Sequence, residues 1–263
     1  CLDRFKGAEI VIINLAAARF DFGATAHNYY RLNLECHSKF LKSLSGYKIK
    51  KFIHVSSVAA LDGKHIPYSE DLNCDDAYRS TKYLQEVLIQ EWCESRDIEL
   101  TTLYPSAIFS DYPRSDTNIG KLQSISKFIP FAPQIDVVKS LTYLPNFCRF
   151  IVDSVADEIP PGKYLTLEKP SLTVSQIIQV ISGRSIRLIH IPGLQFFTKT
   201  VANCLYVIGF FGKIDLKLTP NRVVKLFSDT SYSELTDKTI DVETYSVRNK
   251  SLLSDILENF HAI

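Results

Sequence analysis

Runs of apolar residues alternate with helical repeats in the first hundred residues of the chain. The stretch AEIVIINLAAA, residues 8–18, is continuously apolar and rich in isoleucine and valine, which is typical of a parallel strand covered on both faces. Similar patterns predict a second strand at residues 52–56 and a third, closed by proline, at residues 98–105.

Two helices are predicted between these strands. The first ends at Gly46 and carries apolar residues near the helical period at Tyr30, Leu34, Leu41 and Leu44. The second begins with Asp75 or Asp76 as its N-cap, and its predicted apolar stripe is Leu84, Val87, Leu88 and Trp92. The order β-α-β-α-β, with helices of crossover length, predicts an α/β fold with a doubly wound parallel sheet.

Length and charge narrow the organisation of the chain further. The 263 residues suffice for one large α/β domain or two lobes, and 30 basic against 29 acidic side chains favour neither nucleic acid nor an anionic membrane as partner. We predict an incomplete nucleotide-binding domain at 1–108, with a later strand near 162–168. Residues 109–263 are predicted to form mainly a smaller, mostly helical substrate lobe.

A tyrosine and a lysine stand four residues apart in the second helix, Tyr78 and Lys82. That spacing places both side chains on one helix face, where they meet by chance or share a ligand. Ligands of doubly wound sheets bind beyond the carboxyl ends of the strands. The first predicted strand ends at Asn14 to Ala17, the second at Ser56 and Ser57, and the third at Pro105. The convergence of these residues on one edge favours a functional site.

The ordered set of these features resembles the extended short-chain dehydrogenase/reductase family, the NAD-dependent epimerases and dehydratases. The motifs are IVIINLAA, Asn33 of RLNLECHSKFL, KFIHVSS, the Y-x-x-x-K of Tyr78 and Lys82, and LTTLYPSAIFS. The resemblance covers residues 10–109 most specifically and implies a Rossmann-like domain. It also implies a homodimer that packs the helices containing Asn33 and Tyr78 together.

The resemblance assigns roles at the strand ends. Tyr78 would be the acid/base that exchanges the hydroxyl proton, and the Lys82 ammonium would stabilise its phenolate and hold the nicotinamide ribose. Ser57 would orient the reacting oxygen, with Ser56 as the competing candidate. The residues implied to lie at the NAD or NADP cofactor are Ala16, Ala17, Asn33, Tyr78, Lys82 and Pro105.

The family's glycine-rich phosphate loop is missing from this sequence. None of the ten glycines forms the motif G-x-x-G-x-x-G, which binds the pyrophosphate at a helix N-terminus in such folds. We therefore expect a chain truncated before its first βαβ units, which by itself binds a dinucleotide poorly. Its sheet is expected to have an exposed edge with uncovered apolar surface.

The implied reaction is hydride transfer on a nucleotide-linked sugar, as an epimerase, dehydratase or reductase. Lys139 and Arg222 lie near the positions that contact the diphosphate in the family, and Arg114 or Lys121 are further candidates. A 3-beta-hydroxysteroid-dehydrogenase-like enzyme and a non-catalytic nucleotide-binding scaffold remain the alternatives.

The remaining signals point to a cytoplasmic protein without a metal. The six cysteines are scattered, with no C-x-x-C and no His/Cys cluster at zinc spacing, so we expect them to be reduced and mostly packed in the core. The apolar stretch 201–212 is too short to cross a bilayer. A buried helix is predicted there, with contact to a membrane surface as the alternative.

Overall fold

The computed structural model resolves the chain into two compact units. The first comprises residues 1–106, 144–167 and 239–245, and the second comprises 107–143, 168–238 and 246–263. The residues that the structure describes are 5–18, 25–110, 124, 128, 130–169, 171–182, 186–212, 224, 226–230, 232 and 243–245.

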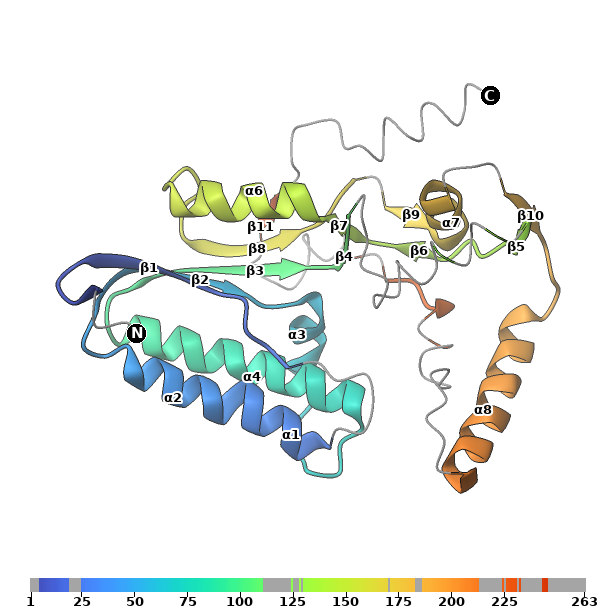
Figure 1. The fold of residues 1–263 in the computed structure, drawn as a ribbon, viewed down its shortest axis with the longest axis horizontal. Helices are drawn as coiled ribbons and strands as arrows, with labels where there is room; N and C mark the ends of the chain where they lie inside the picture. Colours follow the sequence, from blue (N-terminus) through green and yellow to red (C-terminus); the bar gives the residue numbers. More distant parts are fainter. Residues whose placement is uncertain are drawn as a thin grey trace. The chain divides into compact units, whose positions relative to one another are not determined.

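The first unit is built on a five-stranded sheet in the order β1-β2-β3-β8-β11, in which every pair of neighbours is parallel (Figure 1). The strands are β1 (Glu9–Asn14), β2 (Lys48–Val55), β3 (Glu99–Pro105), β8 (Gly162–Thr166) and β11 (Glu243–Tyr245). The predicted α/β class with a parallel sheet is therefore confirmed. The three strands predicted at 8–18, 52–56 and 98–105 are β1, β2 and β3.

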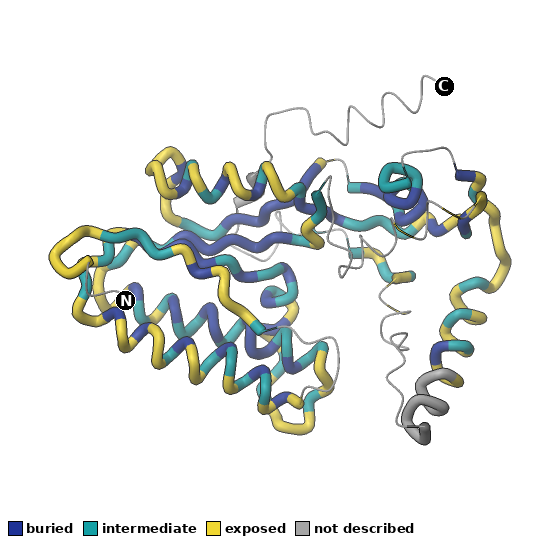
Figure 2. The backbone as a smooth tube through the Cα atoms, in the orientation of Figure 1, coloured by how far each residue is buried: buried dark blue, intermediate teal, exposed yellow. Residues whose placement is uncertain are grey.

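Helices cover both faces of this sheet, as Figure 1 shows. On one face lie α1 (Ala26–Tyr30), the π-helical turn η2 (Arg31–Glu35), α2 (Cys36–Ser43) and the long α4 (Cys74–Glu94). On the other face lies α6 (Leu144–Val155), whose Phe147 and Phe150 pack on Ile53 and Leu103 of the sheet. Figure 2 shows burial concentrated on the central strands and on the helix faces turned towards them.

The long helix α4 begins earlier than predicted. Asn73 is its N-cap, and the Asn73 side chain accepts hydrogen bonds from the backbone N–H groups of both Asp75 and Asp76. Those two acidic residues therefore occupy the first helical turn, where negative charge favours the positive end of the helix dipole.

The buried face of α4 also differs from the predicted stripe. Leu84, Val87, Leu88 and Trp92 are only half-buried. The fully buried positions are Ala77, Ser80, Thr81, Lys82, Gln85, Glu86, Ile89 and Cys93. The face that the helix turns inward is thus largely polar, which a search for an apolar repeat passes over.

Strand β1 lies at one end of the sheet and is covered less than its neighbour. Its side chains are mostly exposed or half-buried, and Ile13 is 44% exposed, whereas Phe52 and Ile53 of β2 are fully buried. The expected edge with uncovered apolar surface is therefore present in the described sheet.

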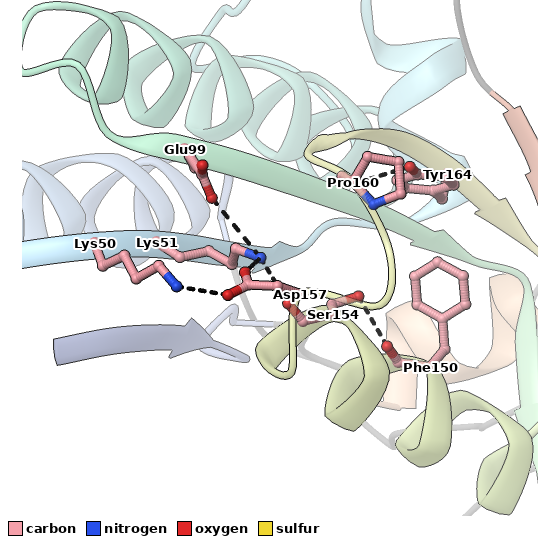
Figure 3. Close-up of polar contacts among 8 residues, drawn as sticks. All are labelled: Lys50, Lys51, Glu99, Phe150, Ser154, Asp157, Pro160 and Tyr164. Carbon is pink, nitrogen blue, oxygen red and sulfur yellow. Dashed lines mark hydrogen bonds and ion pairs between the residues drawn. The ribbon is translucent and has the colours of Figure 1, made fainter.

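An ion cluster fixes the loop after α6 to the amino-terminal half of β2 (Figure 3). The ammonium of Lys51, whose side chain is 1% exposed, lies 2.5 Å from a carboxylate oxygen of Asp157 and donates to the Ser154 carbonyl at 2.8 Å. Lys50 contacts the other oxygen of Asp157 at 2.5 Å. Hydrogen bonds from Lys50 and Lys51 lower the pKa of Asp157 to about 2.

The described residues of the second unit include short paired strands and helices. Parallel pairs join β4 (Ala107–Phe109) to β7 (Leu141–Tyr143) and β5 (Phe131–Pro133) to β10 (Arg187–Ile189). An antiparallel pair joins β6 (Val138–Lys139) to β9 (Leu172–Thr173). Helix α7 (Val174–Ser182) packs its buried Val174 and Ile178 beside Ala132 and Ile135.

Helix α8 (Leu194–Gly212) includes the apolar stretch 201–212. Among the side chains described in it, residues 194–204, only Ala202 is buried, and Phe196 is 77% exposed. Within the predicted stretch itself, Ala202 is buried, Val201 is half-buried, and Asn203 and Cys204 are exposed, while the side chains of 205–212 lie outside the described residues. A search of the described residues for a helix long and apolar enough to cross a bilayer found none.

Five cysteines lie in the described residues, and each is free. Only Cys93 is buried, and burial raises the pKa of its thiol to about 12. The prediction that the cysteines pack in the core is right for Cys93 and wrong for the four exposed ones, Cys36, Cys74, Cys148 and Cys204.

Candidate functional site

Lys82 is buried on α4 beside the carboxyl end of β2. Its side chain is 1% exposed, and its ammonium donates to the side-chain oxygen of Gln85 at 2.8 Å and to the Val55 carbonyl at 3.3 Å. Both partners are neutral. Burial lowers the pKa of Lys82 to about 8, and the more distant carboxylate of Glu86 acts in the opposite direction.

Gln85 connects this lysine to the end of β1. Its amide nitrogen donates to the Ala16 carbonyl at 3.2 Å and lies 2.7 Å from Nε2 and 2.9 Å from Nδ1 of the His37 ring. Because Gln85 is fully buried, all of its polar atoms must find partners inside the protein. Its partners are the Ala16 carbonyl just after β1, the ring of His37 on α2 and the ammonium of Lys82 on α4, so Gln85 links three parts of the first unit.

Two histidines, His37 of α2 and His54 of β2, lie beside Asn14 at the end of β1, and neither is assigned a role by the sequence analysis. Nδ1 of His54 lies 3.2 Å from the amide nitrogen of Asn14, and the His54 Nε2 has no hydrogen-bond partner among the residues that the structure describes. Burial, then the charge of Lys82, hold the pKa of His54 well below its ordinary value. Burial also lowers the pKa of His37. The site therefore collects buried nitrogen bases around one lysine.

Asn33 fixes the segment that follows β1. It lies in the π turn η2 and is fully buried; its amide oxygen accepts from the Ala18 N–H at 2.7 Å, and its amide nitrogen donates to Oγ1 of Thr81 at 3.2 Å. Asn33 reaches α4 at Thr81, next to Lys82, while Gln85 is the residue that contacts the lysine itself.

The two serines after β2 have different environments. Ser56 is 5% exposed, and its hydroxyl donates to the buried carboxylate of Glu86 at 3.4 Å. Ser57 is half-buried and caps helix α3 (Val58–Gly63), where its hydroxyl oxygen accepts from the Ala59 N–H at 3.2 Å. The Ser57 hydroxyl hydrogen is still available to a ligand, because a hydroxyl both donates and accepts.

Close packing of α3 on α4 holds Ser57 near the helix of Tyr78. A Cβ added to Gly63 would lie 2.1 Å from the carbonyl oxygen of Arg79, so only glycine permits this approach.

Glu86 anchors a second polar cluster behind Ser56. Its carboxylate accepts hydrogen bonds from the Tyr104 hydroxyl and pairs with the Lys163 ammonium at 3.0 Å. Burial and the charge of Glu86 raise the pKa of Tyr104. The cluster joins α4 to β3 and β8, and it gives Glu86 a positively charged partner in Lys163.

Tyr78 lies one helical turn before Lys82 and is half-buried. Its ring packs edge-on against the ring of Tyr29 with centroids 6.1 Å apart. Tyr68 and Leu72 belong to the same apolar cluster. The phenol is thus held by aromatic packing on the side of α1.

Comparison with known protein families identifies the fold. The model of the NAD dependent epimerase/dehydratase family matches residues 4–137, just over half of the chain. The chain belongs to this family. No curated protein sequence matches it significantly.

Solved structures of epimerases share the fold at low sequence identity. The UDP-glucuronic acid 4-epimerase from Bacillus cereus, in complex with NAD, is 20% identical with a TM-score of 0.55, and the match covers 72% of this chain and 64% of that one. This family member therefore spans less than two thirds of that epimerase.

Two further structures extend the comparison. The UDP-N-acetylglucosamine 4-epimerase from Bacillus cereus is 14% identical with a TM-score of 0.56, over 72% of this chain and 69% of that one. RMD from Pseudomonas aeruginosa, complexed with NADPH, is 14% identical with a TM-score of 0.54, over 68% and 69%.

The other predicted site residues of this family member are placed as follows. Ala16 and Ala17 are exposed after β1, and Pro105 is buried as the last residue of β3. Lys139 belongs to the second unit, where its ammonium donates to the Ser228 carbonyl and burial lowers its pKa. Arg222, Arg114 and Lys121 lie outside the described residues.

Proposed function

We propose that this protein transfers a hydride between NAD or NADP and a carbon of a nucleotide-linked sugar, as an epimerase, dehydratase or reductase. The observation that carries the proposal is the buried Lys82, held by neutral groups one helical turn from Tyr78. The similarity to UDP-sugar epimerases supports the sugar substrate.

The residues present fit the nicotinamide side of the cofactor. Small exposed side chains at Ala16 and Ala17 leave room for close approach after β1, and the Lys82 ammonium offers a donor to a ribose hydroxyl. The residues present do not fit the pyrophosphate of the cofactor, because the sequence contains no G-x-x-G-x-x-G loop to bind it. When bound, the nicotinamide supplies the acceptor or donor of the hydride.

Tyr78 would take the proton of the substrate hydroxyl and return it when the carbonyl is reduced. A tyrosine phenol, with an ordinary pKa of about 10, needs nearby positive charge to act as a base at neutral pH. Lys82 would supply that charge from a buried position one helical turn away. Ser57 would donate its hydroxyl hydrogen to the reacting oxygen, while Ser56 is engaged with Glu86.

The test is replacement of Tyr78 by phenylalanine in the full protein. We expect turnover to fall by about 10²- to 10⁴-fold, the usual effect of removing a general acid/base. Tyr83→Phe is the matched control, since it makes the same change on the same helix and should retain turnover. A panel of UDP-sugars and sterols, followed by nicotinamide fluorescence, separates the sugar enzyme from a steroid dehydrogenase. Normal turnover in Tyr78→Phe would sink the proposal, and binding without turnover of any substrate would favour the scaffold.

Two further parts of the proposal concern assembly and location. We propose a homodimer formed through the helices that carry Asn33 and Tyr78, and a cytoplasmic protein. Sedimentation of the full protein at micromolar concentration tests the first part, with a monomer as the contradicting result.

A further inference from the structure

The ammonium of Lys82 is held in place by a single side chain. Its contacts are the Gln85 side-chain oxygen at 2.8 Å and the backbone carbonyl of Val55 at 3.3 Å, and within the described residues it forms no ion pair with a carboxylate. We propose that Gln85, oriented by His37 and by the Ala16 carbonyl, is a positioning residue that holds the Lys82 ammonium at the carboxyl end of β2.

The orientation of the Gln85 amide follows from its partners. Lys82 can only donate, so the amide oxygen must face it. The amide nitrogen then faces the opposite way, where the Ala16 carbonyl accepts at 3.2 Å and the His37 ring lies at 2.7 Å. A reversed amide would bring two donors, the ammonium and the NH₂ group, into contact inside the protein. The side chain therefore has one satisfactory arrangement.

His37 must be neutral for this arrangement to hold. Each ring nitrogen lies near an oxygen that can only accept, Nδ1 at 3.3 Å from the Leu32 carbonyl and Nε2 at 3.4 Å from the amide oxygen of Asn14, and both lie within 2.9 Å of the Gln85 nitrogen. In either neutral tautomer one ring nitrogen donates to its oxygen and the other accepts from Gln85. A protonated ring would present a second donor to the Gln85 NH₂ group. The backbone of Ala16, the charge of Lys82 and the ring of His54 also act on His37. The burial that disfavours protonated His37 therefore also preserves the Gln85 orientation.

The first arm of the test measures Lys82 directly, without any substrate. Lysine side chains are labelled with ¹⁵N and ¹³C, Lys82→Met assigns the Lys82 signal, and the protein is titrated by NMR. In Gln85→Met the ammonium loses an acceptor, so its titration midpoint should fall by roughly one pH unit. In Gln85→Glu it gains a counter-charge, so the midpoint should rise by at least as much. Gln90→Met, the same change on the same helix at a half-buried residue that donates to Glu94, should leave it unchanged.

Opposite shifts in the two variants cannot result from general loosening of the fold. A Lys82 midpoint in Gln85→Met equal to that of the Gln90→Met control would overturn the proposal. The unmodified protein provides a second arm if a variant does not fold. The ¹⁵N shifts of His37 at neutral pH should show a neutral ring with hydrogen on one nitrogen, and a protonated ring would contradict the proposal.

The catalytic consequence of this inference rests on the proposed function, but its test does not. If Tyr78→Phe keeps full turnover while the Lys82 midpoint follows Gln85, the enzyme mechanism fails and the positioning role stands. If Tyr78→Phe is inactive while the Lys82 titration midpoint is the same with and without Gln85, the positioning role is wrong and the proposed mechanism stands. If both stand, Gln85→Met should lower turnover and move the alkaline limb of its pH profile in parallel with the Lys82 midpoint.

Discussion

The first unit buries a lysine near each end of β2, and the two differ in what surrounds them. Lys51 and Lys82 are each 1% exposed. Lys51 lies 2.5 Å from the carboxylate of Asp157 and 3.8 Å from that of Glu99, whereas Lys82 contacts an amide oxygen and a backbone carbonyl. Within the described residues, the buried ammonium of Lys51 is thus paired with carboxylates, whereas that of Lys82 is bound by neutral oxygens alone.

This difference separates a structural role from a chemical one. At Lys51 the Asp157 counter-ion stabilises the charged ammonium, and the ion pair attaches the loop of Asp157 to β2. This structural role requires a lysine that stays charged. Neutral partners satisfy the hydrogen bonds of Lys82 but not its charge, so burial lowers its pKa to about 8. Groups with such shifted values concentrate at functional sites.

The largest expected effect comes from exchanging each lysine for methionine. Lys82→Met should lower turnover by about 10²-fold or more while the protein remains folded, because the phenol of Tyr78 loses its neighbouring charge. Lys51→Met should lower stability and leave turnover per folded molecule unchanged. Steady-state rates normalised to the folded fraction, measured by circular dichroism, check both. Equal losses of turnover in the two variants would contradict the assignment of a structural role to Lys51 and a chemical role to Lys82.

Alkaline pH should reveal the unpaired charge as a gain in stability. Below pH 8 Lys82 is protonated in both the folded and unfolded states, and its burial destabilises the fold in full. Between about pH 8 and its ordinary pKa of 10.5 the unfolded chain binds the proton that the folded chain has released, so stability rises with pH. The gain is on the order of 3 kcal/mol. Urea unfolding at pH 7.5 to 10.5 should show this rise relative to Lys82→Met, and parallel curves would contradict it.

Acid should act on the other end of the sheet, with the smallest effect. The pKa of Asp157 is lowered from 3.8 to about 2, so its stabilising contribution is complete above pH 3.8 and disappears as the pH falls towards 2. The Asp157 side chain is 48% exposed, and salt should weaken the effect further. Acid unfolding of Asp157→Asn should lack this component, while Asp62→Asn at an exposed position should keep it. Identical acid transitions in the unmodified protein and both variants would show that Asp157 does not contribute to stability.

The architecture of the first unit could be predicted from the sequence because buried parallel strands are continuous apolar runs. Such runs identified β1, β2 and β3, and the four-residue spacing identified the Tyr78/Lys82 pair. The buried face of α4 could not, because Ser80, Thr81, Gln85 and Glu86 are polar types that a single sequence assigns to solvent. Their burial depends on partners from other elements.

His37, His54 and Gln85 were missed for the same reason. They lie on α2, β2 and α4, separated along the chain by tens of residues, and only the fold brings them together. A signal was nevertheless present, since Gln85 follows Lys82 by nearly one helical turn and so shares its face. Reading the polar residues on the face of Tyr78 and Lys82 would have found Gln85, but not the histidines.

The π turn η2 sets the phase of the helix from Ala26 to Ser43. Its buried positions Tyr29, Asn33, His37 and Leu41 recur every four residues through this turn, which is wider than the 3.6 of an ordinary helix. In a regular helix, positions four apart drift by about 40° at each step, so the turn absorbs a drift that would carry His37 and Leu41 off the buried face. A deletion inside the turn that restores regular winding would leave those two residues on that face, whereas a deletion between the turn and His37 would rotate them by about 100°.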